Sequence, residues 1–105
     1  MPGCPVLDCG MIESIVQDLA QERCFVCGSM RELELHHIMH GTANRRLATR
    51  NQLTCWLCRT HHRGRFGVHT ANPDLDKRLK QEAQTAFERT HTRQEWMKIF
   101  GKNYL

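Results

Sequence analysis

The sequence lacks any long apolar run. Hydrophobic residues make up 40% of its 105 positions, and Asp8, Glu13 and Asp18 interrupt the region where a secretory leader would carry its apolar segment. No stretch of the sequence approaches the roughly 20 apolar residues that a membrane-spanning helix needs. We therefore expect a cytoplasmic chain with neither a leader nor a membrane anchor.

Acidic residues are absent from the middle of the chain. All 11 Asp and Glu residues lie outside the stretch from Leu35 to Pro73, while the net charge of the whole chain is only +4. That stretch carries the arginines Arg45, Arg46, Arg50, Arg59, Arg63 and Arg65. A surface of one charge sign indicates a polyanionic partner, most simply nucleic acid, although a solvated arginine-rich loop is the alternative.

Cysteine is plentiful, yet a disulfide framework is not expected. Six cysteines in a secreted chain would suggest disulfides, but here they include a Cys24-x-x-Cys27 pair in a chain with seven histidines and no leader. Such a pattern indicates metal binding instead. Cys4 and Cys9 receive no role.

The length fits one small domain over residues 1–105, with a modest core that a structural metal would help to fold. Apolar residues recur at helical spacing from Met11 to Leu19, and alternating patterns further on predict two strands. In chain order we expect a helix over 11–21, a strand over 32–38, a polar loop over 40–52, a strand over 53–57 and a brief helix after it.

Residues 73–101 predict two C-terminal helices. Asn72 before Pro73 is a favourable helix start, because the Asn side chain caps free backbone N–H groups and proline fits the first helical position. The apolar face of this helix comprises Leu75, Leu79, Ala83, Ala86 and Phe87. Thr92 and Glu95 form a capping box that opens the last helix.

Four groups at paired spacings predict one tetrahedral structural zinc. The preferred ligands are Cys24, Cys27, Cys58 and His61, since Cys and His side chains are the usual ligands of such sites. A rival set uses Cys55 in place of His61, because Cys55-x-x-Cys58 is also a cysteine pair. Strand alternation favours the preferred set, since it places Cys55 on the apolar face of its strand.

Three histidines, His36, His37 and His62, stand beside these ligands without being needed for the zinc. Together, Leu35-His36-His37-Ile38, a loop with Gly41 and Asn51, and Cys58-x-x-His61-His62 resemble the HNH endonucleases, also called ββα-metal or His-Me finger nucleases. The likeness is greatest to their small phage-type, endonuclease-VII-like branch, and it covers about residues 24–70. It implies a small α+β fold with a ββα-metal core and a structural zinc, flanked by N- and C-terminal helices.

The resemblance also implies residue roles. His37 would be the general base, since an imidazole titrates near neutrality and can take a proton from the attacking water. His36 stands where the family usually has an Asp metal ligand, and His62 would be the second ligand of the catalytic divalent ion. Asn51 would brace the loop between the strands and orient the base, with Asn44 as the weaker candidate for that role.

The implied function is hydrolysis of DNA phosphodiester bonds by one divalent ion and a histidine base, in phage or prophage DNA processing or recombination. The ion would be Mn²⁺, Ni²⁺, Co²⁺ or Mg²⁺, and nitrogen ligands favour the transition metals over Mg²⁺. The candidates for DNA contacts are Arg45, Arg46, Arg63 and Arg65. The alternative is a non-catalytic zinc module that binds DNA or a protein. A monomer and a homodimer are both compatible with the sequence.

Overall fold

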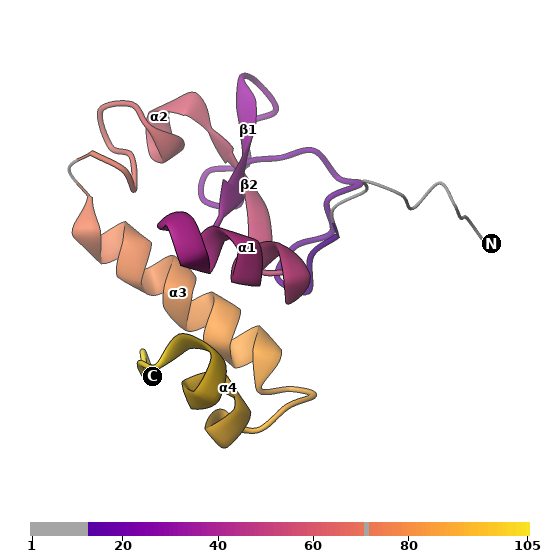
Figure 1. The fold of residues 1–105 in the computed structure, drawn as a ribbon. Helices are drawn as coiled ribbons and strands as arrows, with labels where there is room; N and C mark the ends of the chain where they lie inside the picture. Colours follow the sequence, from indigo (N-terminus) through magenta and orange to yellow (C-terminus); the bar gives the residue numbers. More distant parts are fainter. Residues whose placement is uncertain (1–12, 71) are drawn as a thin grey trace.

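The computed structural model describes residues 13–70 and 72–105. Within these ranges the protein is a small α+β structure with a two-stranded antiparallel sheet and four helices (Figure 1). The elements, in chain order, are β1 (Leu33–His37), α1 (Thr42–Arg50), β2 (Thr54–Cys58), α2 (Arg59–His62), α3 (Pro73–Phe87) and α4 (Arg93–Phe100). Both predicted strands and the brief helix after the second one are confirmed.

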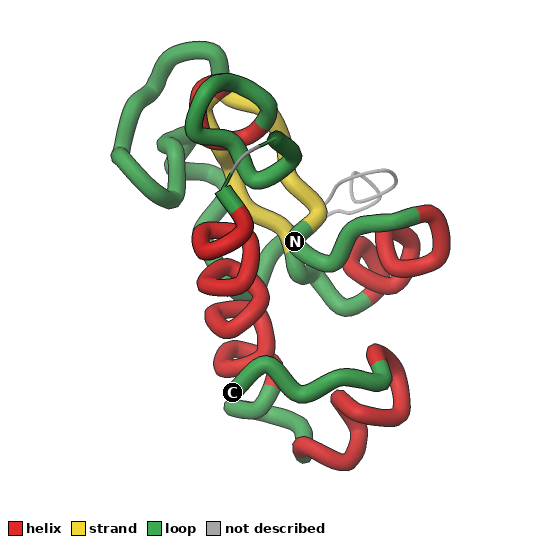
Figure 2. The backbone as a smooth tube through the Cα atoms, turned by 90° about the vertical axis from the view of Figure 1, so that its left-hand side faces the viewer, coloured by secondary structure: helices red, strands yellow, loops and turns green. Residues whose placement is uncertain are grey.

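The sheet register gives the two adjacent histidines of β1 different partners on β2. His36 pairs with Cys55 and His37 pairs with Thr54, and the two strands lie side by side (Figure 2). Because successive side chains of a strand point to opposite faces, His36 and His37 face opposite sides of the sheet. β1 ends at His37, so the histidine pair lies at the strand terminus.

The predicted N-terminal helix over 11–21 is wrong for its described part. Residues 13–21 contain no helix, and residues 11 and 12 lie outside the described residues. The backbone of this segment bonds to other elements instead: Ile15 N–H donates to Gln52 O at 2.9 Å, and the Gln17 side chain accepts from Trp56 N–H at 2.7 Å. The Ser14 hydroxyl accepts from the N–H of residue 16, which gives the backbone an alternative to helical bonding.

The polar segment 40–52 was expected to be a loop, and that expectation is also wrong. It contains α1, which starts after Gly41, at φ 101°, and ends at Asn51, whose side-chain amide donates to Leu47 O at 2.9 Å. One face of α1 is apolar, since Ala48 is fully buried while Arg45 is exposed. The apolar face is narrow and the exposed arginines dominate the composition, which hides the helical periodicity.

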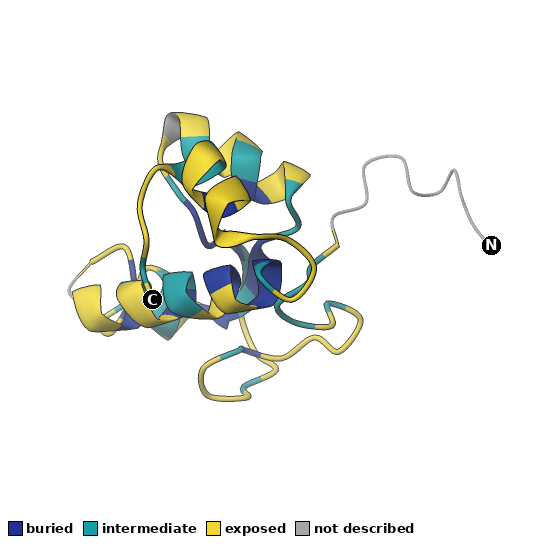
Figure 3. Ribbon diagram, turned by 90° about the horizontal axis from the view of Figure 1, so that it is seen from below, coloured by how far each residue is buried: buried dark blue, intermediate teal, exposed yellow. Residues whose placement is uncertain are grey.

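The core joins the sheet, α1 and α3, and continues to α4 (Figure 3). The predicted apolar face of α3 is confirmed, since Leu75, Leu79, Ala83, Ala86 and Phe87 are all buried. The capping box of α4 is present, and Trp96 of α4 packs against Phe87 with ring centroids 5.4 Å apart. In the described ranges, no helix has both the length and the apolar character to cross a membrane.

Candidate metal-binding sites

The first candidate site joins a turn to the end of β2. Gly28 adopts φ 79°, a conformation that favours glycine, and its N–H donates to Cys24 O at 2.9 Å, which closes the Cys24–Cys27 turn. The N–H of Phe25 donates to Trp56 O at 2.8 Å, so the turn is fixed directly to β2. These bonds bring the turn next to Cys58, the last residue of the strand.

Four ligand atoms meet there. The side chains of Cys24, Cys27, Cys58 and His61, which we call the Cys/His group, have ligand atoms within 4.8 Å of one another. The two sulfurs of Cys27 and Cys58 are 3.8 Å apart, and Cys58 Sγ lies 3.2 Å from His61 Nδ1. Two sulfurs bound tetrahedrally at about 2.3 Å from one zinc ion would be about 3.8 Å apart. The group could therefore hold a metal such as zinc.

The structure separates Cys55 from this group. The Cys55 side chain is fully buried in the core, and burial raises the pKa of its thiol. Burial alone would also raise the pKa of Cys24, but hydrogen bonds from the backbone of Cys27, Cys58 and Val26 lower it below its ordinary value. Cys24 is thus closer to the thiolate form that binds metal, whereas Cys55 is a small core residue.

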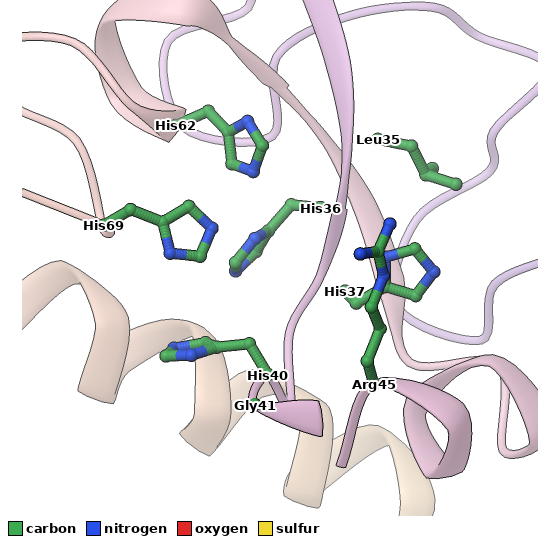
Figure 4. Close-up of a pocket in the computed structure, with 8 residues that line it drawn as sticks. All are labelled: Leu35, His36, His37, His40, Gly41, Arg45, His62 and His69. Atoms are coloured by element: carbon green, nitrogen blue, oxygen red, sulfur yellow. The ribbon is translucent and has the colours of Figure 1, made fainter. Parts of the chain in front are cut away.

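The second candidate site is a group of imidazoles from β1, α2 and the segment after α2. His36 of β1, His62 of α2 and His69, which we call the histidine group, have ligand atoms within 4.8 Å of one another (Figure 4). The ring centroids of His36 and His62 are 5.2 Å apart, as are those of His36 and His69, and those of His62 and His69 are 4.8 Å apart. His40 lies beside the group, 5.1 Å from His69.

His36 lacks hydrogen-bond partners. It is 1% exposed, and among the described residues its Nδ1 and Nε2 are the buried side-chain nitrogen or oxygen atoms without a partner. Burial, followed by the nearby His62, His69 and His40, lowers the pKa of His36 to about 3. The ring is therefore neutral at pH 7, which is the form that binds a metal ion.

Two carboxylates accept hydrogen bonds from imidazoles that lie beside His36. Glu34 accepts from His62 Nδ1 at 2.7 Å, and Asp76 of α3 accepts from His40 Nε2 at 2.8 Å. Hydrogen bonds from Arg63, and then from His62, lower the pKa of Glu34, so it is a carboxylate that can only accept. His62 therefore donates through Nδ1 and keeps Nε2 free toward the histidine group. Such carboxylate–histidine pairs commonly support metal ligands.

His37 lies apart from the histidine group. Figure 4 shows its ring on the other side of β1, beside Arg45 of α1. Burial, followed by the charge of Arg45, lowers the pKa of His37. One pocket of about 440 Å³ nevertheless reaches both sides of the strand end, and its lining comprises Leu35, His36, His37, His40, Gly41, Arg45, His62 and His69.

The other predicted site residues lie further from this pocket. Asn51 caps the C-terminus of α1 and so braces the connection between the strands, but it does not line the pocket. Arg46 is exposed on α1. Arg63 is engaged by Glu34, to which its Nε donates at 2.9 Å, and Arg65 lies over the ring of Phe66.

Sequence reasoning assigned no role to four contributors to the site. His69 and His40 were single histidines without a paired spacing, and Glu34 and Asp76 were ordinary acids of a strand and a helix. The one local signal was Gly67, because a Cβ there would meet the His62 carbonyl carbon at 2.7 Å. That close approach brings the chain back beside His62 and places His69 in the group.

The fold and the two groups define a class: a small α+β protein with a Cys/His group beside a histidine group. No protein-family model matches the sequence, and neither a curated protein nor a solved structure matches the chain. The case for a function therefore depends on the side chains of the two groups.

Proposed function

We propose that this protein is a metal-dependent DNA endonuclease of the HNH, ββα-metal type. The observation that carries the proposal is the histidine group beside the Cys/His group. A structural zinc needs four ligands, and Cys24, Cys27, Cys58 and His61 supply them. His36 of β1, His62 of α2 and His69, which follows α2, then remain for a second ion.

The chemistry of the histidine group fits a catalytic metal. His36 has two buried nitrogens without partners in the described part of the chain, and burying such atoms costs free energy unless something binds them. The carboxylate of Glu34 orients His62 so that one nitrogen stays available. Three imidazoles would leave open positions for substrate on the ion, in contrast to the four-ligand Cys/His group.

The donor set also indicates which ion binds. Neutral imidazole suits Mn²⁺, Ni²⁺, Co²⁺ or Zn²⁺ better than Mg²⁺. When bound, the ion would act as a Lewis acid that offsets the charge developing on the phosphate in the transition state. Its proposed ligands are His36 and His62, with His69 as the third.

In this proposal His37 is the general base. Burial and the charge of Arg45 favour the neutral imidazole at pH 7, so the ring can accept a proton from the water that attacks phosphorus. His36 and His37 face opposite sides of β1, which suits separate tasks at a phosphate in the shared pocket. His36 would hold the ion at that phosphate, and His37 would accept the proton of the attacking water. The breaking bond would be the one from phosphorus to the 3′ oxygen, which leaves 5′ phosphate and 3′ hydroxyl ends.

Arginines supply the proposed contacts to DNA. Arg45 lines the pocket. Arg46 and Arg65 are exposed, and all three arginines belong to the stretch without any Asp or Glu. Arg63 has a different role, since it holds Glu34 in place behind His62. Guanidinium groups suit phosphate because their planar donors match its oxygens. Phage or prophage DNA processing remains the proposed context.

The test is cleavage of supercoiled plasmid by zinc-loaded, dialysed protein with Mg²⁺, Mn²⁺ or Ni²⁺ added separately. Wild type should nick the plasmid in a metal-dependent way, and His37→Ala should lose at least about 100-fold in rate while it keeps its zinc and its circular dichroism. The matched control is His91→Ala, an exposed histidine that stacks on Phe87 near α4 and should cleave normally. Failure of folded, zinc-loaded wild type on every ion would indicate a non-catalytic DNA- or protein-binding zinc module.

A further inference from the structure

A short loop connects two members of the histidine group, His62 and His69. Residues 63–67, which we call the tip loop, connect His62 to Val68 and His69. The N–H of Val68 donates to His61 O at 3.0 Å, and the N–H of His69 donates to His62 O at 3.1 Å. Each of these bonds joins the two ends of the loop, so its base is fixed to the backbone of both candidate sites.

Hydrogen bonds within the tip loop and to the residues after it fix its backbone. Gly67 N–H donates to Gly64 O at 3.1 Å, and the Thr70 hydroxyl donates to Gly64 O at 2.7 Å. The Asn72 side chain donates to Phe66 O at 3.1 Å. Because the backbone is already ordered, a ligand that binds the tip loop pays little of the usual entropic cost of ordering a loop.

The end of the tip loop presents an aromatic ring and a cation. Phe66 is 55% exposed, and it is the only exposed ring among the Phe, Trp and Tyr residues, all of which the structure describes. The Arg65 guanidinium carbon lies 5.7 Å from the centre of the Phe66 ring, within the range of a cation–π contact. Arg65 forms no ion pair in the described ranges, so its charge is available to a ligand.

These properties match one kind of ligand. A planar aromatic face with a cation beside it suits a nucleobase and the phosphate attached to it, because every base has a π-face and DNA is anionic. The absence of Asp and Glu between Leu35 and Pro73 makes the surroundings favourable to that anion. Bases in an intact duplex are already stacked on one another, and separating them costs free energy at each step, so the ring favours an unpaired base.

We propose that Phe66 and Arg65 form a stacking contact for an unpaired DNA base next to the scissile phosphate. This inference rests on the proposed function and names its substrate class: single-stranded DNA, or a duplex that carries an unpaired segment. We infer the position near the scissile phosphate from the loop base, because the loop connects His62 to His69 and both histidines line the pocket. The stacking contact selects the DNA structure, whereas the histidine group acts on the phosphate.

Binding tests the inference separately from cleavage. The affinities of zinc-loaded, full-length protein for a short single-stranded oligonucleotide and for a hairpin duplex are measured by fluorescence anisotropy, with no second metal added. Phe66→Ala should weaken single-strand binding by about 5- to 150-fold, the usual range for losing one base–aromatic stack, and should change duplex binding by less than about twofold. Phe66→Trp should retain single-strand affinity, and Phe66→Leu should lose it, because leucine is apolar but has no π-face.

The matched control is Met30→Ala. Met30 is 71% exposed and lies just after the Cys24–Cys27 turn, so it tests the general effect of removing an exposed apolar side chain. A second readout is photocrosslinking of single strands that carry 5-iodouracil at successive positions. Irradiation should join the base to Phe66 at one position, and mass spectrometry should locate the link.

The outcomes separate the two proposals. Equal single-strand affinity for wild type and Phe66→Ala, or equal losses on single strand and duplex, overturns the stacking contact whatever the plasmid assay shows. A selective loss of single-strand binding supports the stacking contact even if wild type cleaves no DNA with any ion, in which case only the nuclease proposal fails. No binding of either DNA by folded wild type overturns the stacking contact, and plasmid cleavage with added metal then decides the nuclease proposal by itself.

Discussion

Replacing His36 by phenylalanine removes two buried ring nitrogens and keeps a planar ring at the same place in β1. Those nitrogens lack partners among the described residues, and an unpaired buried polar group costs about 1–3 kcal/mol. Without a metal in the histidine group, His36→Phe should therefore stabilise the zinc-loaded protein by about 1–3 kcal/mol. The larger ring has room, because the pocket of about 440 Å³ adjoins His36.

Added metal should offset that difference in stability. A ligand at 100 times its Kd stabilises the state that it binds by about 2.7 kcal/mol, so Ni²⁺ at that level should raise the free energy of unfolding of wild type by about this amount. His36→Phe loses one of three ligands and should gain far less. The contrast comes from one residue whose nitrogens are costly when unbound and favourable when bound.

The assay is urea unfolding of dialysed protein that retains one zinc per chain by elemental analysis, with and without Ni²⁺. His69→Ala is the matched comparison: His69 is exposed, so its removal should abolish the nickel effect without stabilising the nickel-free protein. A His36→Phe protein that is less stable than wild type by about 2 kcal/mol or more, with and without nickel, would refute the reasoning. It would mean that His36 supports the fold rather than a metal.

The remaining predictions concern the same residues. Plasmid cleavage should be faster with Mn²⁺ or Ni²⁺ than with Mg²⁺, because the proposed ligands are all nitrogens, and equal or faster cleavage with Mg²⁺ would contradict this. Glu34→Gln should weaken nickel binding to zinc-loaded protein about 10- to 100-fold by calorimetry, because His62 loses its anionic support; unchanged affinity would show that Glu34 only pairs with Arg63. Gly67→Ala should lower both the midpoint of urea unfolding and the nickel affinity, because its Cβ would stand 2.7 Å from the His62 carbonyl oxygen. As pH falls from about 6.5 toward about 3, wild type should lose up to about 1.4 kcal/mol of stability per pH unit relative to His36→Phe, since the unfolded histidine binds the proton that the folded one resists. Zinc release affects both proteins and cancels in this difference, and parallel acid unfolding curves would contradict the assignment.

Local sequence determined the elements whose signals are complete within a few residues. The strands over 33–37 and 54–58 follow from residue alternation, and α3 and α4 follow from their caps and apolar spacing. The Cys/His group was also predictable, because Cys-x-x-Cys and Cys-x-x-His spacings each bring two ligands together through a short turn. Such features depend on neighbouring residues, so they need no knowledge of the remaining chain.

Two elements were not predictable in this way. The segment over 13–21 has helical periodicity, but the backbone of Ile15 bonds to Gln52, and tertiary bonds of this kind outweigh the weak helix preference of a short segment. For α1 the error was the reverse: its polar composition predicts a loop, because it hides a narrow buried face around Ala48. In both cases the decision depends on surfaces that other elements supply.

The sequence by itself determined that histidines at 36, 37 and 62 would lie near a Cys/His group. His62 directly follows the ligand His61, and the strand that carries the other two histidines lies between Cys27 and Cys58 in the sequence. That His36 and His37 face opposite sides of β1 follows from strand alternation. Only the tertiary structure decided that His69 joins His36 and His62, and that Glu34 and Asp76 support the imidazoles. The physical reason is distance along the chain. His40 and Asp76 are 36 residues apart, and His36 and His69 are far apart in the sequence as well, so these contacts exist only where the elements that carry them meet in the folded chain.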